Sequence, residues 1–230
     1  MAYKVLNNVS VKDVTSSDLL SLKTDLLVIV INKNTKDKVV NQLAKDVSSH
    51  LKESGSSVLV PNAKSFNAKN VLLVKGFQDS DQIHKLISMY QSIAQKGNQL
   101  KAKDISIMPG TVYPKGKCEM WLIEMVAKTI ESNVYIFSET CNKTAKKPSV
   151  KKLNILVSSL TKSDLIKAKN AAKKGYAIGE GVNSAKYLGD LPANHCTPRI
   201  IEKKVKAMTK DFPKLKVKSF NENQMKKMGM

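Results

Sequence analysis

The fold of this chain is decided by residues 70–108, which read NVLLVKGFQDSDQIHKLISMYQSIAQKGNQLKAKDISIM. This segment opens with an apolar run at 71–74, which is typical of a strand buried on both faces. Residues 81–96 then place apolar side chains at helical spacing, and Gly97 is expected to end the helix. A second short strand is predicted at 104–108. Because strands alternate with helices, we expect a mostly parallel sheet with helices on its faces.

The same alternation continues on both sides of this segment. Residues 24–31, TDLLVIVI, form another continuous apolar run rich in β-branched side chains, as in a buried central strand. The remaining predicted elements are strands at 57–61 and 153–157, helices at 39–51 and 117–132, and a strand or a helix end at 133–137. Together these elements predict an α/β domain that covers residues 1–160.

A lysine-rich stretch leads out of this domain into a long helix. Residues 142–149 are predicted to form an exposed basic loop, and Thr161 is placed to cap a helix that continues to about Leu188. Residues 175–181 of this helix, GYAIGEG, have a glycine spacing that suits either a phosphate-binding loop or close helix packing. The segment lacks the lysine–serine pair of a phosphate loop and follows no strand, so close packing is the favoured interpretation.

Residues 190–198, DLPANHCTP, predict a turn followed by the start of a new helix. Pro192 favours an extended path before it, and Thr197 is placed to cap a helix whose first residue is Pro198. Residues 195–196, His-Cys, are the residue types of a catalytic dyad. Adjacent residues rarely face each other, however, so we assign them no catalytic role. Beyond the turn we expect a helix and then a strand.

The composition indicates a globular intracellular chain. Of its 230 residues 42% are hydrophobic, and it has no apolar run of membrane-spanning length and no apolar signal core at its N-terminus. Three widely spaced cysteines, Cys118, Cys141 and Cys196, indicate free thiols, and the absence of CxxC and HxxxH spacings argues against a zinc site. We therefore expect a cytoplasmic protein that has no membrane partner.

The formal net charge of +20 leaves a binding function open. A basic surface attracts phosphate backbones without sequence preference, whereas specific base reading favours arginine, and Arg199 is the only arginine. Weak, non-specific binding of DNA or another polyanion is therefore the alternative function. Its best local footprint consists of five lysines: Lys143, Lys146, Lys147, Lys151 and Lys152.

The last part of the chain resembles a known family. Residues 176–230 run from a helix through a Gly-Asp turn, Leu-Pro-Ala-Asn and Thr-Pro into a second helix, and end on Lys-x-x-Gly-Met. This order is similar to the entry segment of the catalytic domain of the leucyl aminopeptidases. The resemblance implies a macro-domain-like N-terminal domain at 1–160, a linking helix at 161–190, and the first elements of an incomplete α/β catalytic domain at 191–230.

The resemblance also implies a chemistry. Leucyl aminopeptidases are cytosolic homohexamers that remove N-terminal residues, preferably leucine, from peptides by means of two divalent metal ions, Mn or Zn. Their metal ligands lie in the motifs D-S-G-G and N-T-D-A-E-G-R, and neither string occurs in this sequence. We therefore expect an N-terminal fragment that is inactive alone, with no catalytic, cofactor-binding or metal-binding residue of its own, so whether the chain counts as an enzyme stays open.

Overall fold

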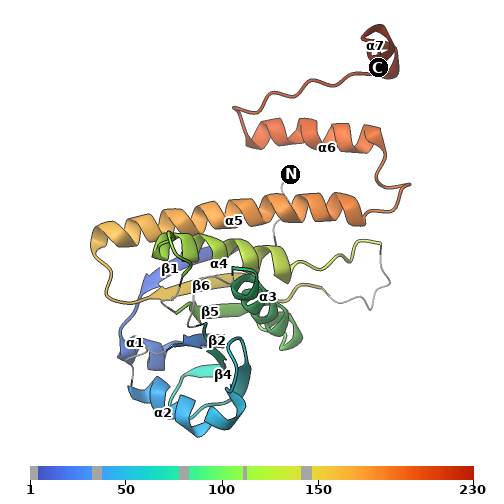
Figure 1. Ribbon diagram of the computed structural model, residues 1–230. Helices are drawn as coiled ribbons and strands as arrows, with labels where there is room; N and C mark the ends of the chain where they lie inside the picture. The colour runs from blue at the N-terminus through green and yellow to red at the C-terminus, as the bar shows by residue number, and fades with distance from the viewer. Residues whose placement is uncertain (1–4, 33–37, 78–82, 111–112, 141–146) are drawn as a thin grey trace.

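The computed structural model describes residues 5–32, 38–77, 83–110, 113–140 and 147–230 (Figure 1). The strands in this part are β1 (Asn8–Asp13), β2 (Thr24–Ile31), β3 (Ser57–Pro61), β4 (Ala68–Lys75), β5 (Asp104–Met108) and β6 (Lys152–Val157). The helices are α1 (Ser16–Ser21), α2 (Lys38–Asp46), the 3₁₀ turn η1 (Ser48–His50), α3 (Ile83–Gln99), α4 (Glu119–Val134), α5 (Lys162–Asp190), α6 (Pro198–Asp211) and α7 (Glu222–Lys227).

The described strands form one sheet in the order β1-β6-β5-β2-β4-β3. All neighbours run parallel except β3, which is antiparallel to β4. Strand β2 lies in the interior of the sheet, where Val28 is in register with Leu72 of β4 and with Ile107 of β5. The predicted mostly parallel mixed sheet is thus confirmed, and the apolar run at 24–31 is its buried centre.

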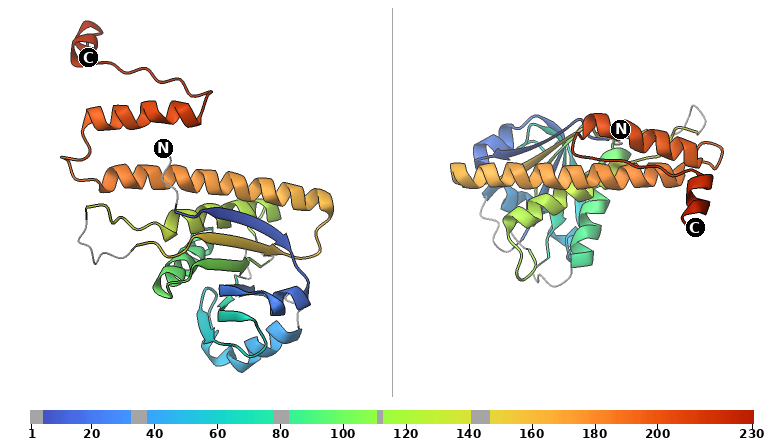
Figure 2. Two further views of the ribbon diagram at one scale, coloured as in Figure 1. Left: turned by 180° about the vertical axis from the view of Figure 1, so that it is seen from behind. Right: turned by 90° about the horizontal axis from the view of Figure 1, so that it is seen from above.

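Helices cover both faces of the sheet. On one face, α1 and α2 bury Leu19 and Val40 against β2 and β4. On the other face, α3 and α4 pack on the sheet, and α4 is so deeply enclosed that Ile123 and Ile130 have no exposed surface. Helix α4 is enclosed because α5 lies across its outer side (Figures 1 and 2).

Small residues allow α5 to lie close to α4. The buried positions of α5 are Ala168, Ala172, Gly175, Gly179 and Asn183, which form one narrow stripe along the helix. A Cβ atom at Gly175 would lie 2.1 Å from the Glu124 carbonyl oxygen, and one at Gly179 would lie 2.7 Å from Glu131 Cβ.

The interpretation of 175–181 as a packing segment is therefore confirmed for two of its three glycines. It is wrong for Gly181, where a Cβ atom would meet nothing within 4 Å. Gly181 lies on a different face of the helix, because residues two positions apart do not share a face.

The ends of α5 follow their local signals. The Thr161 hydroxyl accepts a hydrogen bond from Asp164 N–H (3.1 Å), so the predicted N-cap is confirmed. The helix ends at Asp190, and Leu191 adopts the extended conformation expected of a residue that precedes Pro192.

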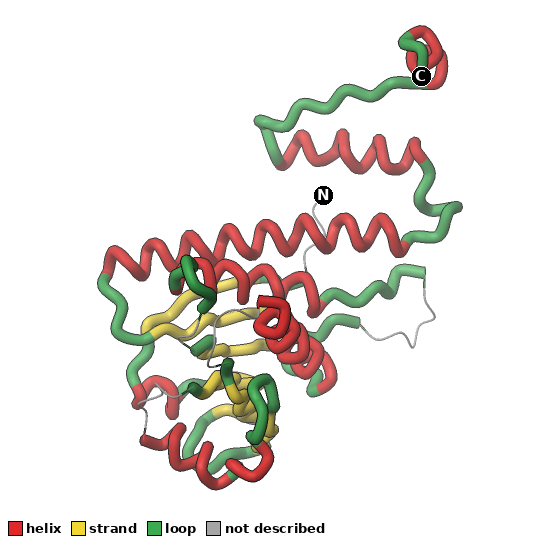
Figure 3. The backbone as a smooth tube through the Cα atoms, viewed as in Figure 1, coloured by secondary structure: helices red, strands yellow, loops and turns green. Residues whose placement is uncertain are grey.

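The C-terminal segment, residues 198–230, lies outside the body of the molecule. Helix α6 runs beyond α5, on the side away from the sheet, and α7 lies further out (Figures 1 and 2). Neither helix has a buried residue. The strand predicted after α6 is wrong: residues 212–221 form an extended loop (Figure 3). A strand needs a neighbour for its backbone hydrogen bonds, and none lies beside this segment in the described part of the chain.

Two further differences from the predicted elements have physical reasons. Gly97 does not end α3 but lies inside it, because a Cβ atom there would be 2.7 Å from Ile105 Cδ1. Strand β1 and helix α1 were not predicted, since β1 is short and only Val11 of it is fully buried. Residues 133–137, predicted as a strand or a helix end, contain the end of α4 at Val134, so the second alternative is confirmed. Most of the predicted basic loop at 142–149 lies outside the described residues.

Candidate functional site

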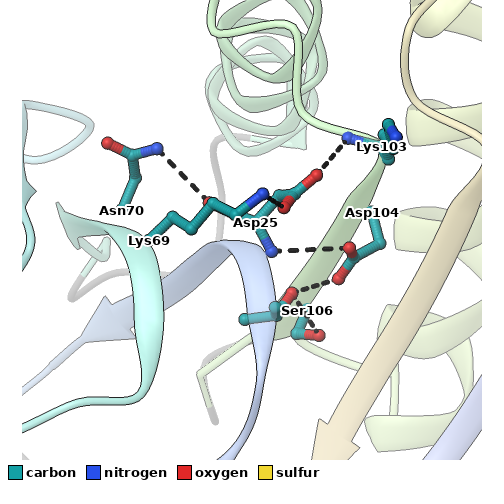
Figure 4. A network of polar contacts seen from close by, with 7 residues as sticks. Asp25, Lys69, Asn70, Lys103, Asp104 and Ser106 are labelled. Atoms are coloured by element: carbon teal, nitrogen blue, oxygen red, sulfur yellow. Dashed lines mark hydrogen bonds and ion pairs between the residues drawn. The ribbon is translucent and has the colours of Figure 1, made fainter.

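A chain of hydrogen bonds links neighbouring strands of the sheet, and Figure 4 shows the part of it around Ser106, Asp104 and Asp25. Ser10 Oγ donates to Asn154 Oδ1 (2.8 Å), and Asn154 Nδ2 donates to Ser106 Oγ (3.0 Å). Ser106 Oγ in turn donates to Thr24 Oγ1 (3.0 Å), whose hydroxyl donates to the Asp104 carboxylate. The chain thus links β1, β6, β5 and β2, and it satisfies the buried hydroxyls of Thr24 and Ser106.

Asp25 extends this network to β4. Its carboxylate forms an ion pair with Lys69 Nζ (2.5 Å) and accepts a hydrogen bond from Lys103 N–H (2.8 Å). The Lys69 ammonium, followed by the Lys103 N–H, lowers the pKa of Asp25. These donors hold the carboxylate at the amino ends of the strands, whereas ligands of parallel sheets bind at the carboxyl ends. We therefore interpret the network as a structural feature and not as a binding site.

A cleft of about 280 Å³ lies at the carboxyl ends of β2 and β4. It is lined by Ile31, Asn32, Ala44, Ser48, Leu51, Lys75 and Gly76. Lys75 Nζ donates to the Lys52 carbonyl oxygen (2.6 Å). Among the described residues, this lining includes no carboxylate, imidazole or thiol.

A buried carboxylate on α4 joins three parts of the chain. The Glu131 side chain has no exposed surface. Its oxygens accept hydrogen bonds from Val5 N–H and Leu6 N–H and from Asn183 Nδ2 on α5, each at 3.0 Å. Burial, to which the charge of Glu180 adds, raises the pKa of Glu131 above that of an ordinary glutamate.

A second polar joint lies where α5 ends. Lys186 Nζ donates to the Ser132 carbonyl oxygen (2.5 Å), and the Tyr135 hydroxyl donates to Asp190 Oδ2 (2.8 Å). Burial lowers the pKa of Lys186. Lys204 of α6 lies over the Tyr187 ring, with Nζ 4.5 Å from its centroid. These contacts tie the end of α4 to α5 and connect α5 to α6.

The turn at 190–198 takes the predicted path. Pro198 is the first residue of α6 and Thr197 is its N-cap, as predicted. The Thr197 side chain makes no capping hydrogen bond, because Ile200 N–H, its expected donor, bonds to the Thr197 backbone carbonyl instead (2.9 Å). Cys196 Sγ lies 3.2 Å from the Leu188 carbonyl oxygen, and the adjacent His195 is exposed.

The five lysines of the expected polyanion footprint are only partly described. Lys147 and Lys152 are exposed, and Lys151 is half-buried, with its backbone N–H bonded to Lys103 O (2.8 Å). Lys143 and Lys146 lie outside the described residues. The footprint therefore stays a prediction.

Neither a metal centre nor a membrane helix is present in the described part of the chain. No group of three or more histidine, cysteine, aspartate and glutamate side chains there could hold a metal ion. No helix there is long and apolar enough to cross a membrane.

Comparison with known proteins gives one consistent result, although no protein-family model matches the chain. The chain is 28% identical over 231 residues to a probable cytosol aminopeptidase of Azotobacter vinelandii. The aligned region covers 94% of the chain and 46% of that protein. It is 26% identical over 225 residues to the cytosol aminopeptidase of Pseudomonas aeruginosa, over 91% of the chain and 44% of that protein. The chain thus spans less than half the length of these relatives.

Solved structures share the fold. A mutant of tomato leucine aminopeptidase matches with a TM-score of 0.74 and 19% identity, over 100% of this chain and 47% of that one. The bottromycin maturation enzyme BotP matches with a TM-score of 0.64 and 15% identity, over 90% of this chain and 41% of that one. The chain is therefore a homologue of the N-terminal part of the cytosol aminopeptidases, by sequence over most of its length and by fold. This is the leucyl aminopeptidase family that its last residues resemble.

Proposed function

We propose that this chain supplies the N-terminal domain and the linking helix of a metallo-aminopeptidase of the leucyl type. The observation that carries the proposal is the pattern of coverage: the match to named aminopeptidases includes 94% of the chain but only 46% of the relative. We assign residues 1–160 to the N-terminal domain, 161–190 to the linking helix, and 191–230 to the start of the catalytic domain.

The packing supports this division. Helix α5 is held along α4 by its stripe of small residues, whereas α6 and α7 bury none of theirs. The C-terminal segment also exposes large apolar side chains: Ile201, Phe212, Leu215, Phe220, Met225, Met228 and Met230. Exposed apolar groups in one segment mark a surface that packs against something else, which in this proposal is the catalytic domain.

The proposed reaction is hydrolysis of the N-terminal peptide bond of peptides, with leucine preferred. Two divalent cations, Mn or Zn, would polarise the scissile carbonyl and activate a water molecule. We assign the ligands of these ions to residues outside this sequence, because the motifs that hold them in the family do not occur in it. The complete enzyme would be a cytoplasmic homohexamer, and this chain would be inactive by itself.

The alternative function, a basic binding module for DNA or another polyanion, is not favoured, since the named relatives are aminopeptidases. Non-specific DNA binding then follows from the surface charge and does not define the function.

The test has two arms. The purified chain alone, supplied with Mn, Zn or Mg, is expected not to hydrolyse leucine p-nitroanilide. A chimera in which the chain replaces the matching N-terminal part of the Pseudomonas aeruginosa enzyme is expected to hydrolyse it, and the remaining C-terminal part alone is the control. Metal-dependent activity that copurifies with the chain alone through several columns would overturn the proposal that this chain is inactive by itself. A folded chimera without activity would count against the proposed role.

A further inference from the structure

The first described residues of the chain are bound through one side chain. Glu131 Oε1 accepts Val5 N–H and Oε2 accepts Leu6 N–H. From α5, the Tyr176 hydroxyl donates to the Leu6 carbonyl oxygen (2.8 Å), and Asn183 Nδ2 donates to Glu131. Residues 5–6, α4 and α5 therefore meet at a single buried carboxylate.

This junction has no room for a larger residue at Gly179 of α5. A Cβ atom at Gly179 would lie 2.8 Å from Glu131 Cγ, so the α5 backbone is pressed against the carboxylate stem. Asn183 is fully buried beside it. Movement of α5 away from α4 would therefore open the junction and admit solvent to Glu131.

Glu131 forms none of the ion pairs found in the described part of the chain. A buried carboxylate without a cation is costly unless it binds a proton or enough hydrogen-bond donors. Three N–H donors stabilise its charge in part, but burial outweighs them. Asn183 Oδ1 is also buried and has no hydrogen-bond partner among the described residues.

The charged surroundings favour the same protonated form. Among the described residues, Glu180 of α5 carries the negative charge that raises the pKa of Glu131 further. Tyr176 is neutral, because burial raises its pKa. Of the other charged side chains on the packed elements, Lys128 on α4 and Lys12 and Asp13 on β1 are exposed. Glu124 on α4 is half-buried and forms an ion pair with Lys174 of α5, and Lys186 of α5 donates to the Ser132 carbonyl oxygen.

We propose that Glu131 is a proton-dependent latch that couples the N-terminal segment to α5. The closed junction binds a proton more tightly than an open, hydrated one, because the closed state desolvates the carboxylate. Protonation therefore stabilises the closed junction, and rising pH ionises Glu131 and favours opening. Since α5 continues into the C-terminal segment, the latch controls how firmly that segment is attached. This inference does not depend on the proposed aminopeptidase role.

Amide hydrogen exchange of the full chain, measured by NMR between about pH 5 and about pH 8, tests the latch. After correction for intrinsic exchange rates, the protection of the Val5 and Leu6 amides should fall with rising pH between the pKa of an ordinary, hydrated glutamate and the Glu131 midpoint. The fall should reach at most about tenfold per pH unit, the limit for one linked proton, and protection should level off above the midpoint. Glu131→Gln is a permanently neutral isostere, so its Val5 protection should not depend on pH.

A second variant separates the latch from simple packing. Glu180→Gln removes the neighbouring charge and should move the midpoint to lower pH while leaving the pH dependence in place. Protection that is independent of pH in the wild type, or a pH dependence that survives in Glu131→Gln, would overturn the proposal. If Glu131→Gln does not fold, ¹³C titration of the Glu131 carboxyl in the wild type decides, and a midpoint at or below that of an ordinary glutamate refutes the latch.

Discussion

At the scale of single residues, the glycines of α5 show how one atom sets a helix position. Gly175 and Gly181 belong to the same helix and to the same glycine-rich motif. A Cβ atom would collide with the Glu124 backbone at the first and would enter open space at the second. The same substitution should therefore have opposite effects on stability at the two positions.

Gly175→Ala is expected to destabilise the protein by about 1–3 kcal/mol, the usual cost of overpacking. The obstacle is a backbone carbonyl, which cannot move aside as a side chain would. Gly181→Ala is the matched control and should stabilise α5 by up to about 1 kcal/mol, because alanine favours the helix more than glycine does. Urea unfolding measures both free energies. Equal effects from the two substitutions would show that α5 does not pack on α4 as described.

At the scale of secondary-structure elements, α5 and α6 differ in what holds them. Helix α5 has a cap at Thr161, a buried stripe and two polar joints. Helix α6 is capped only by the backbone of Thr197 and has no buried residue. Helices that lack tertiary packing are marginal in water at this length, so α6 should open far more readily than α5.

Limited proteolysis should therefore cut the chain first between Lys203 and Lys218. Trypsin has lysines to cut throughout the chain, so the order of cleavage reports local opening and not only the availability of sites. Mass spectrometry identifies the first fragments, and proteinase K, which does not require lysine, provides the control. An initial cut within the N-terminal domain would contradict the expected loose attachment of the C-terminal segment.

At the scale of the whole molecule, the charge of +20 is spread widely. Several lysines are engaged in the fold, among them Lys69 with Asp25, Lys174 with Glu124 and Lys186 with Ser132 O. The aromatic content is 5%, which leaves few rings on which bases could stack. Binding to nucleic acids should therefore depend on charge alone.

Duplex DNA of any sequence should be retained weakly at low salt and released as salt approaches physiological strength. Replacing Lys143, Lys146, Lys147, Lys151 and Lys152 by glutamine should reduce this retention if they form the local footprint. The control replaces five exposed lysines elsewhere: Lys38, Lys45, Lys52, Lys64 and Lys85. Filter binding over a salt series measures the retention. Tight binding to one duplex at high salt would refute a purely electrostatic interaction.

Features of this protein that depend on neighbours along the chain can be predicted from its sequence. The β2 run at 24–31, the Thr161 cap and the helix end before Pro192 all follow from side-chain chemistry within a few residues, and the structure confirms each. The family resemblance also lay in a local string, at residues 176–230.

Features that depend on distant parts of the chain become visible only in the folded molecule. Gly97 lies inside α3 because Ile105 and Val150 leave no space for a side chain, although glycine by itself signals a helix end. The segment after α6 forms no strand, since no neighbouring strand completes its hydrogen bonds in the part of the chain that the structure describes. In the sequence, Glu131 resembles any other helical glutamate. It is buried only because α5 and residues 5–6 close over it, and residues 5–6 lie more than a hundred positions away along the chain. Burial and pairing are set by contacts between distant residues, which local spacing does not encode.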